Sequence, residues 1–156
     1  MTRACSTLYF LAGVTSSGKT SLALDWAEQN GAEILSCDSV AIYKGMDVGS
    51  AKPTMAERER VVHHGLDLVN VGERYDVSKY LEYAKDVILD AYSRKSIILV
   101  VGGSGFYLRS FFASVVDRVS VNEEIKNSVD RTYQIHGLDG LLKELNLLNP
   151  QGLGKL

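Results

Sequence analysis

The sequence predicts an α/β fold in which helices cover both faces of a parallel sheet. Three observations support this prediction. Short apolar runs that suit buried strands alternate with longer segments whose apolar residues recur at helical spacing. The first strand-like run leads directly into a glycine-rich loop and a helix. The 156 residues, 46% of them hydrophobic and 23% charged, are enough to bury one sizeable core.

The first part of the chain predicts a strand, a helix and a second strand in succession. Residues 8–12 are a short apolar run closed by a glycine, as expected for a buried strand. Apolar residues at helical spacing then predict a helix over residues 20–30, which Gly31 can end in a left-handed conformation. Residues 32–37 form a second strand-like run that leads to Asp38. This order favours a parallel sheet.

The same pattern repeats further along the chain. Residues 66–71 predict a third strand, and an apolar stripe over residues 77–91 predicts a long helix that Asp76 can cap. Residues 97–101, IILVV, are the clearest buried strand, because the run is continuous, β-branched and closed by two glycines. We therefore expect a sheet of four strands or more.

After residue 120 the pattern is helical only. Five leucines are spaced for one helical face that needs a partner to cover it: Leu138, Leu141, Leu142, Leu145 and Leu148. We expect an incomplete α/β core at residues 1–118 and a separate helical segment at residues 119–156. No apolar stretch approaches the ~20 residues that a membrane-spanning helix needs.

Charge and cysteine content narrow the function only slightly. The net charge of −2 neither indicates nor excludes a polyanionic partner, because a local basic groove can exist within a balanced total. Cys5 and Cys37 have neither metal-ligand spacing nor the number that a disulfide framework needs. This favours a reducing, intracellular setting in which both thiols behave as small apolar groups.

The loop GVTSSGKT matches the phosphate-binding pattern GxxxxGK[ST] in full and lies between a predicted strand and a predicted helix. We expect successive backbone N–H groups and the positive end of the helix to converge on a phosphate. Lys19 would add a charge, and the Thr20 hydroxyl is the expected Mg²⁺ ligand. A fold like that of the P-loop NTPases, with ATP in the loop, is the default interpretation. The phosphate-binding candidates are Gly13, Val14, Thr15, Ser16, Ser17, Gly18, Lys19 and Thr20.

The acidic residues argue against a hydrolytic motor. P-loop NTPases usually hold Mg²⁺ with an Asp at the end of another strand, but the IILVV strand ends in GGSG at residues 102–105. Asp38 is the acid that does follow a strand, at the edge where ligands bind in such sheets. It could act as a general base or simply cap a turn. Ser104 faces the same edge and could position either reactant.

Three functions are compatible with these residues. In a small-molecule kinase, ATP occupies the loop, Asp38 activates a hydroxyl, and a lid supplies arginines. In a group transferase, the phosphates in the loop are the leaving group and a carbon is transferred. A nucleotide-dependent regulatory module is a third, non-enzymatic possibility, for which the sequence offers no switch segment.

Five sequence blocks add a more specific indication. In chain order, within about residues 10–111, they read GVTSSGKTSLAL, DSVAIYKGMDVGSAKPT, HHGLDLV, YDVSKY and VGGSGFYL. Together they resemble the tRNA dimethylallyltransferases, also called tRNA isopentenyltransferases. The resemblance implies transfer of a dimethylallyl group from dimethylallyl diphosphate to the exocyclic amine of an adenosine beside the tRNA anticodon. The diphosphate, rather than ATP, would lie in the loop, and the anticodon stem-loop would be the RNA partner.

The resemblance also implies roles for individual residues. Asp38 would accept the amine proton, while Thr15 and Ser104 would position the diphosphate and the adenosine. Lys19 and a Mg²⁺ ion on Thr20 would stabilise the departing diphosphate. The adenine would leave the anticodon stack to reach the site. The implied tRNA-binding positions are Asp38, Ser39, Val40, Ala41 and Ser104.

Two of these positions depart from the family pattern. Ala41 stands where the family usually has Gln, which puts part of the nucleotide recognition in doubt, and Ser104 stands where Thr is usual. The adenylate isopentenyltransferases, which act on free nucleotides by the same chemistry, remain an alternative.

The resemblance extends weakly to the end of the chain. Residues 119–156 resemble the start of the family's inserted tRNA-clasping domain. The usual chain is about twice as long, so the later basic residues that complete the diphosphate and tRNA sites lie beyond this sequence. Residues 1–156 alone are therefore expected to show little activity. We expect a monomer in the cytoplasm.

Several chemically suggestive residues receive structural interpretations. His63 and His64 are adjacent, without a third ligand nearby, and are expected just before a strand rather than in a metal site. Tyr43 and Tyr107 are expected to pack in the core rather than stack on a base. For Lys52, a solvated side chain and a contact with the RNA backbone are equally open. A solvated face is the default for the basic residues of the last helices, Lys126, Arg131 and Lys143.

Overall fold

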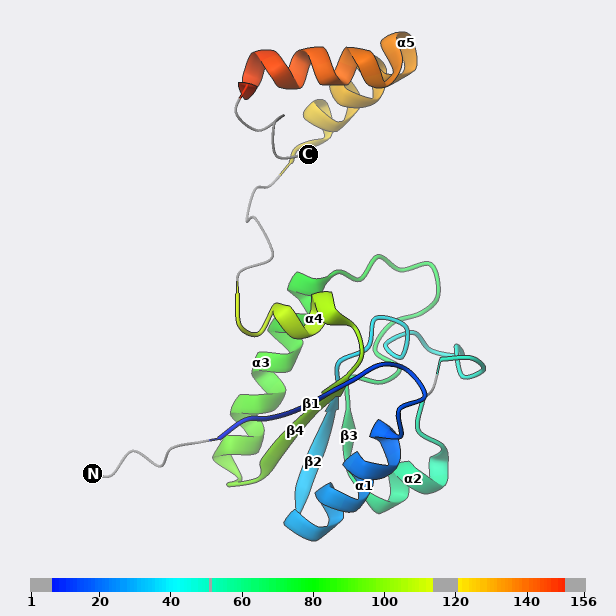
Figure 1. Ribbon diagram of the computed structural model, residues 1–156, viewed down its shortest axis with the longest axis vertical. Helices are drawn as coiled ribbons and strands as arrows, with labels where there is room; N and C mark the ends of the chain where they lie inside the picture. The colour runs from blue at the N-terminus through cyan, green and yellow to red at the C-terminus, as the bar shows by residue number, and fades with distance from the viewer. Residues whose placement is uncertain (1–6, 51, 114–120, 151–156) are drawn as a thin grey trace, which may run out of the picture. The chain divides into compact units, whose positions relative to one another are not determined.

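The computed structural model describes residues 7–50, 52–113 and 121–150. The chain divides into two compact units, Met1–Val116 and Asp117–Leu156 (Figure 1). The first unit is an α/β structure and the second is helical. The boundary that we predicted between residues 118 and 119 lies outside the described residues, as does Cys5.

The first unit is built on a parallel four-stranded sheet in the order β1-β4-β2-β3. Its strands are β1 (Tyr9–Ala12), β2 (Ala32–Ser36), β3 (His63–His64) and β4 (Ile97–Gly102). Because every strand runs in the same direction, the carboxyl ends of all four meet at one edge of the sheet. The phosphate loop, the segment that begins at Asp38 and the GGSG turn all leave the sheet at this edge.

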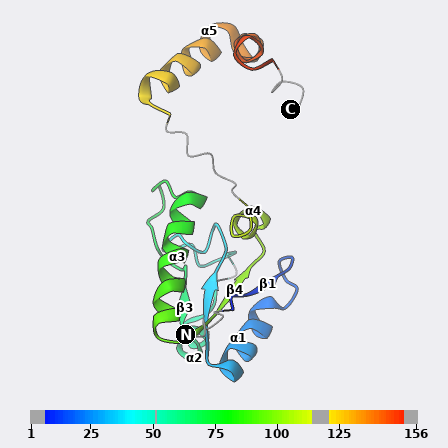
Figure 2. The same cartoon turned by 90° about the vertical axis from the view of Figure 1, so that its left-hand side faces the viewer.

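Helices cover both faces of the sheet (Figure 2), as the sequence predicts. They are α1 (Lys19–Asn30), α2 (Met55–Arg60), α3 (Val77–Ser93) and α4 (Gly105–Arg109). Successive strand residues point to opposite faces, so each face has its own core. Ile34 and Leu99 pack toward α1. Leu35 and Ile98 pack instead with α3 and α4 around the fully buried Tyr80.

Local sequence signals explain where several helices begin and end. Gly31 ends α1 with φ 60°, the left-handed conformation that was predicted for it. The Asp76 side chain caps α3, as predicted, by accepting a hydrogen bond from the Lys79 N–H at 3.0 Å. Helix α2 was not predicted, although the sequence contains its signal: Thr54 and Glu57 form a reciprocal capping box.

The third predicted strand is wrong in position. Residues 66–71 form a loop that touches the segment after β2 through an isolated parallel bridge between Val69 and Tyr43. The strand is His63–His64, so these histidines lie in β3 rather than before it. Gly65 follows with φ 78°, and a Cβ there would lie 2.6 Å from the Ser36 carbonyl oxygen. The chain therefore packs closely against the end of β2 at Gly65 and then continues as a loop beside the segment that follows β2.

The second unit consists of α5 (Glu123–Leu148), which Asn122 caps through a hydrogen bond from the Ile125 N–H. Gly137 has φ 62° and ψ −159°, so the element is two helices joined at a break that the leucine spacing does not indicate. The three basic side chains of this segment are exposed, as predicted: Lys126, Arg131 and Lys143. Among the described residues, none of the helices combines the length and the apolar character needed to cross a bilayer.

An ion pair near the amino end of β2 joins the buried Glu33 to the half-exposed Arg94. Glu33 is 8% exposed, and Arg94 donates hydrogen bonds to both of its carboxylate oxygens, at 2.6 and 3.1 Å. The Arg94 hydrogen bond outweighs the opposing effect of burial and, with help from His64, lowers the pKa of Glu33 to about 2. A lowered pKa in the folded state stabilises the fold at neutral pH, by up to about 3 kcal/mol.

We expect Glu33→Gln to reduce the free energy of unfolding at neutral pH and to flatten its decline in acid. In the native protein this contribution is lost as the pH falls from about 4.5, the ordinary pKa of glutamate, toward about 2. Urea unfolding between pH 7 and pH 3 measures both effects. Glu28→Gln, which removes an exposed carboxylate that pairs with Arg60, is the matched control with a small effect. If the free energy of unfolding of both variants declines equally between pH 7 and pH 3, the lowered pKa assigned to Glu33 is wrong.

Candidate functional site

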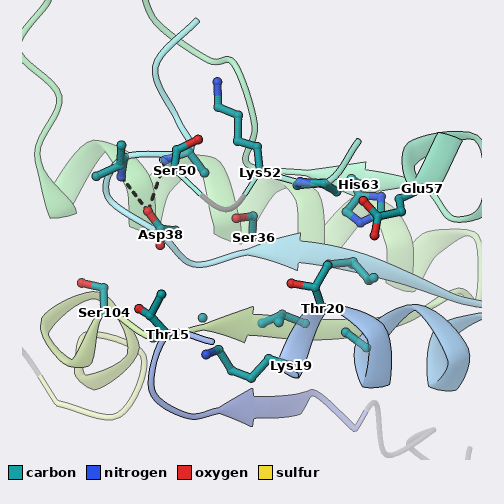
Figure 3. A pocket seen from close by; sticks show the side chains of 18 of the residues that line it. Thr15, Lys19, Thr20, Ser36, Asp38, Ser50, Lys52, Glu57, His63 and Ser104 are labelled. Atoms are coloured by element: carbon teal, nitrogen blue, oxygen red, sulfur yellow. Dashed lines mark hydrogen bonds between the residues drawn. The ribbon is translucent and has the colours of Figure 1, made fainter. Parts of the chain in front are cut away.

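A cavity of about 670 Å³ lies at the carboxyl edge of the sheet, between the phosphate loop and the segment after β2 (Figure 3). It brings together predicted residues from the ends of three strands. Those that line it are Thr15, Ser16, Gly18, Lys19 and Thr20 after β1, Asp38, Ser39, Val40 and Ala41 after β2, and Ser104 after β4. Gly13, Val14 and Ser17 belong to the loop but do not line the cavity.

The phosphate loop has the geometry of an anion site. Ser16 and Gly18 both have positive φ, at 63° and 83°, which curls the backbone just before α1. Helix α1 begins at Lys19, so its unpaired N–H groups and positive dipole end face the cavity, and its first turn contains no acid to oppose an anion. The Lys19 ammonium donates to the Val14 carbonyl and thus folds over the loop.

Only one of the two carboxylate oxygens of Asp38 takes part in hydrogen bonds within the described residues. Its Oδ1 accepts hydrogen bonds from the N–H groups of Val40 at 2.8 Å and Ala41 at 3.2 Å, which fixes the turn after β2. Figure 3 shows both bonds and the carboxylate facing the Thr15 and Ser104 side of the cavity. Within the part of the chain that the structure describes, Oδ2 has no hydrogen-bond partner. The turn cap and the proton acceptor considered for Asp38 are thus compatible.

Close backbone packing sets the spacing between the ends of β2 and β4. The Cys37 N–H donates to the Val101 carbonyl at 2.8 Å, and a Cβ on Gly102 would lie only 2.2 Å from the Cys37 carbonyl oxygen. This contact fixes Asp38 relative to Ser104, which opens α4 without using its hydroxyl as a cap. Cys37 itself is fully buried, and burial raises the pKa of its thiol to about 11, as suits the apolar role predicted for it.

We expect Gly102→Ala to destabilise the protein by about 2 to 4 kcal/mol, because the new methyl group would overlap the Cys37 backbone, which cannot move aside cheaply. Thermal or urea unfolding measures the loss. Gly105→Ala is the matched control, since a Cβ at Gly105 meets no atom within 4 Å. If the two variants unfold at the same midpoint, the close approach of β2 and β4 is wrong.

Sequence reasoning missed the opposite wall of the cavity, to which Ser36, Ser50, Lys52, Glu57 and His63 contribute. The solvated side chain considered for Lys52 is wrong, because this side chain is only 2% exposed. Its three donor positions are occupied by the Tyr43 carbonyl at 2.6 Å and by carboxylates of Asp47 and Asp67 at 2.9 and 2.7 Å. No N–H of this ammonium is left over for an RNA phosphate.

The Lys52 ion pairs hold the cavity wall together. Burial disfavours the charge of Lys52, but the Asp67 and Asp47 hydrogen bonds outweigh burial and raise the pKa of the ammonium. Asp67 also accepts from Arg58 at 2.7 Å, so it joins the loop after β3 to two cations. These contacts join residues 5 to 15 positions apart across irregular segments, and no local sequence pattern indicates them.

His63 and Glu57, on the same wall, have structural partners, whereas the buried Ser50 hydroxyl has none among the described residues. The His63 Nδ1 lies 2.7 Å from the Val61 carbonyl, to which it donates, and burial lowers the pKa of His63. Glu57 is engaged in the Thr54 capping box. In the described ranges, no group of three or more His, Cys, Asp or Glu side chains is placed to hold a metal.

Comparison with known proteins gives relatives over nearly the whole chain. A family model described as IPP transferase matches residues 41–156. A tRNA dimethylallyltransferase from Opitutus terrae is 44% identical over 149 residues, which cover 96% of this chain and 47% of the relative. One from Deinococcus radiodurans is 40% identical over 140 residues, covering 90% and 46%. The chain thus spans about half the length of the curated relatives it matches.

Solved structures agree with the sequence comparisons. A eukaryotic dimethylallyltransferase acting on tRNA superposes with a TM-score of 0.81 at 25% identity, over 96% of this chain and 37% of the other. The full-length tRNA isopentenylpyrophosphate transferase from Bacillus halodurans superposes with a TM-score of 0.68 at 26% identity, over 97% of this chain and 50% of the other. The fold shared with these enzymes is the predicted α/β architecture.

Proposed function

The chain belongs to the IPP transferase family, and we propose that it carries the diphosphate loop and the catalytic base of a tRNA dimethylallyltransferase. The enzyme would move the dimethylallyl group of dimethylallyl diphosphate to the exocyclic amine of an adenosine beside the tRNA anticodon and release diphosphate. One observation carries the proposal: the phosphate loop and Asp38 line the same cavity, across which a phosphate-bearing donor and a nucleophile can meet.

The proposed reaction uses groups that line the first cavity. The amine nitrogen attacks the first carbon of the dimethylallyl group while the bond from that carbon to the diphosphate oxygen breaks, and the electron pair leaves with the diphosphate. Asp38 Oδ2 takes the proton that the nitrogen loses. The Lys19 ammonium and the N–H groups at the start of α1 stabilise the negative charge that collects on the departing diphosphate. Thr15 and Ser104 would orient the two reactants.

The donor chemistry beside the loop suits Mg²⁺. This ion takes few ligands from the protein and completes its shell with phosphate oxygens and water. The exposed Thr20 hydroxyl, in the first turn of α1, is a ligand of the right kind for an ion that is held mainly by the diphosphate. Bound there, Mg²⁺ would supply further positive charge to the leaving group.

The alternatives differ from this proposal in what is transferred and to what. A small-molecule kinase would move a phosphoryl group from ATP, and an adenylate isopentenyltransferase would prenylate a free nucleotide. The names of the relatives support an RNA acceptor. Such an acceptor would place the protein in the cytoplasm with its tRNA. A monomer is sufficient for the proposed chemistry, because one chain supplies all the residues named.

The test compares donors and acceptors directly. The protein is incubated with dimethylallyl diphosphate labelled in its carbon chain, or with ATP labelled in its terminal phosphate, in the presence of tRNA or of AMP. We expect carbon label in the tRNA alone, in a small amount, because residues 1–156 span about half the length of the curated relatives. Carbon label in AMP would favour the adenylate enzyme, and transfer of ATP phosphate to any acceptor would overturn the proposal.

A further inference from the structure

The first unit contains a second cavity, of about 500 Å³, which lies beside the segment that follows β2. Two stretches of chain form it. The first is the segment that follows Asp38, which contributes Tyr43 and Met46, and the second is the turn before α3, which contributes Val71, Arg74 and Tyr75. None of these residues lines the first cavity or has a part in the proposed chemistry.

The lining of this second cavity suits a flat aromatic ligand. Tyr43 and Tyr75 are half-buried, and both pack against the core from the cavity side. Two exposed aliphatic side chains accompany them, Met46 at 40% and Val71 at 67% exposure. Tyrosine rings with apolar neighbours are the surface on which proteins stack nucleobases, since every base has a π-face that such a surface can cover.

One cation, Arg74, and two acids, Glu73 and Asp76, belong to the lining of this cavity. The Glu73 carboxylate accepts hydrogen bonds from the Asn70 backbone and side chain, and Asp76 caps the Lys79 N–H. Both acids are therefore occupied within the turn. The Arg74 guanidinium has no hydrogen bond or ion pair with any residue in the described ranges. An exposed arginine with its donors free matches a phosphate oxygen.

A short, fixed segment joins the two cavities. Asp38 and Tyr43 are five residues apart, which limits the distance between them to about 18 Å even for an extended chain. The Tyr43 N–H donates to the Val40 carbonyl at 3.1 Å, and the Tyr43 carbonyl accepts from the buried Lys52. The two cavities are therefore close and rigidly spaced.

We propose that the second cavity binds a nucleotide of the RNA acceptor near the adenosine that enters the first cavity, with its base against Tyr43 and Tyr75 and its phosphate paired with Arg74. The inference rests on the proposed function, since it takes the acceptor to be a polynucleotide. A free mononucleotide fills only the first cavity and gains nothing from the second. The second cavity thus favours RNA over AMP.

The test compares Arg74→Gln with Lys85→Gln, which removes one exposed charge from α3 and lines neither cavity. The affinity of each protein for an anticodon stem-loop RNA and for AMP is measured across a range of salt concentrations. We expect Arg74→Gln to weaken RNA binding about tenfold and to reduce the slope of log affinity against log salt by about 0.7 to 0.9, the loss of one phosphate contact. AMP binding should not change. Arg74→Lys, which keeps the charge, should restore the slope.

A second variant separates stacking from charge. Tyr75→Leu should weaken RNA binding by about five- to tenfold without altering the salt slope, because the base loses its aromatic surface while every charge remains. If Arg74→Gln binds RNA as Lys85→Gln does, with the same slope, the second cavity is not an RNA site, and label transfer to tRNA still supports the proposed function. If the native protein neither binds RNA nor transfers label to it, both proposals fail.

Discussion

Replacing Asp38 with asparagine is expected to slow dimethylallyl transfer by about a hundred- to ten-thousandfold, the usual contribution of a general base. This variant removes the proton-accepting oxygen and leaves the turn after β2 intact. An asparagine Oδ1 can still accept the N–H groups of Val40 and Ala41, so the turn after β2 remains, but its amide nitrogen cannot take the proton that Oδ2 would receive. Single-turnover rates at saturating donor measure the effect.

Two further variants bracket this prediction. Asp38→Ala removes both oxygens, so it should lose the turn as well and be at least as slow as Asp38→Asn. Asp86→Asn, on the exposed surface of α3, removes one carboxylate outside both cavities and should transfer at the native rate. Binding of diphosphate should be largely unchanged in all three. If Asp38→Asn transfers at the native rate, Asp38 is not the base.

Replacing Lys19 with alanine is expected to weaken diphosphate binding by about a hundredfold and to lower the transfer rate at fixed donor concentration by at least as much. The side chain supplies the positive charge inside the phosphate loop, where its ammonium donates to the Val14 carbonyl. Calorimetric titration with inorganic diphosphate measures the affinity without any need for turnover.

The matched control for Lys19→Ala is Lys85→Ala, which removes the same charge from the surface of α3. It should bind diphosphate with native affinity. A Lys19→Ala protein that is folded and still binds diphosphate as tightly as the native protein would show that the phosphates do not lie in this loop. That result would contradict the assignment of the loop even if transfer to RNA were observed.

Most of the sheet and its covering helices could be predicted because their signals are local. The apolar runs of β1, β2 and β4, the Gly31 end of α1 and the Asp76 cap of α3 each depend on neighbouring residues. The strand predicted at residues 66–71 failed for a backbone reason. Gly65 and Asp67 both adopt positive φ, which removes the chain from the sheet although its apolar pattern suits a strand.

The candidate site was predictable on one side only. The loop and Asp38 follow strand ends directly, so a motif and its position sufficed to bring them together. The wall around Lys52 depends on Asp47, Asp67 and the Tyr43 carbonyl, which meet only after the chain folds. A lysine that looks solvated in the sequence is therefore one of the most buried charges in the described part of the molecule.

The structure also clarifies the departure at Ala41. This residue is 3% exposed and lines the cavity, and it supports Asp38 through its backbone N–H rather than its side chain. A change of residue type there leaves the turn and the carboxylate in place. The glutamine that the family usually has at this position would reach further than alanine. The change to alanine would therefore alter a contact with the acceptor nucleotide and leave the Asp38 carboxylate unaffected.

The most direct measurement uses dimethylallyl diphosphate that carries one label in its carbon chain and another in its phosphates. After incubation with the protein and tRNA, the RNA is separated from small molecules and both labels are counted. We predict that the carbon label moves to the RNA and that an equal amount of phosphate label appears as free diphosphate. Phosphate label in the RNA, or release of diphosphate without carbon label in the RNA, would contradict the proposal that the phosphates in the loop are the leaving group.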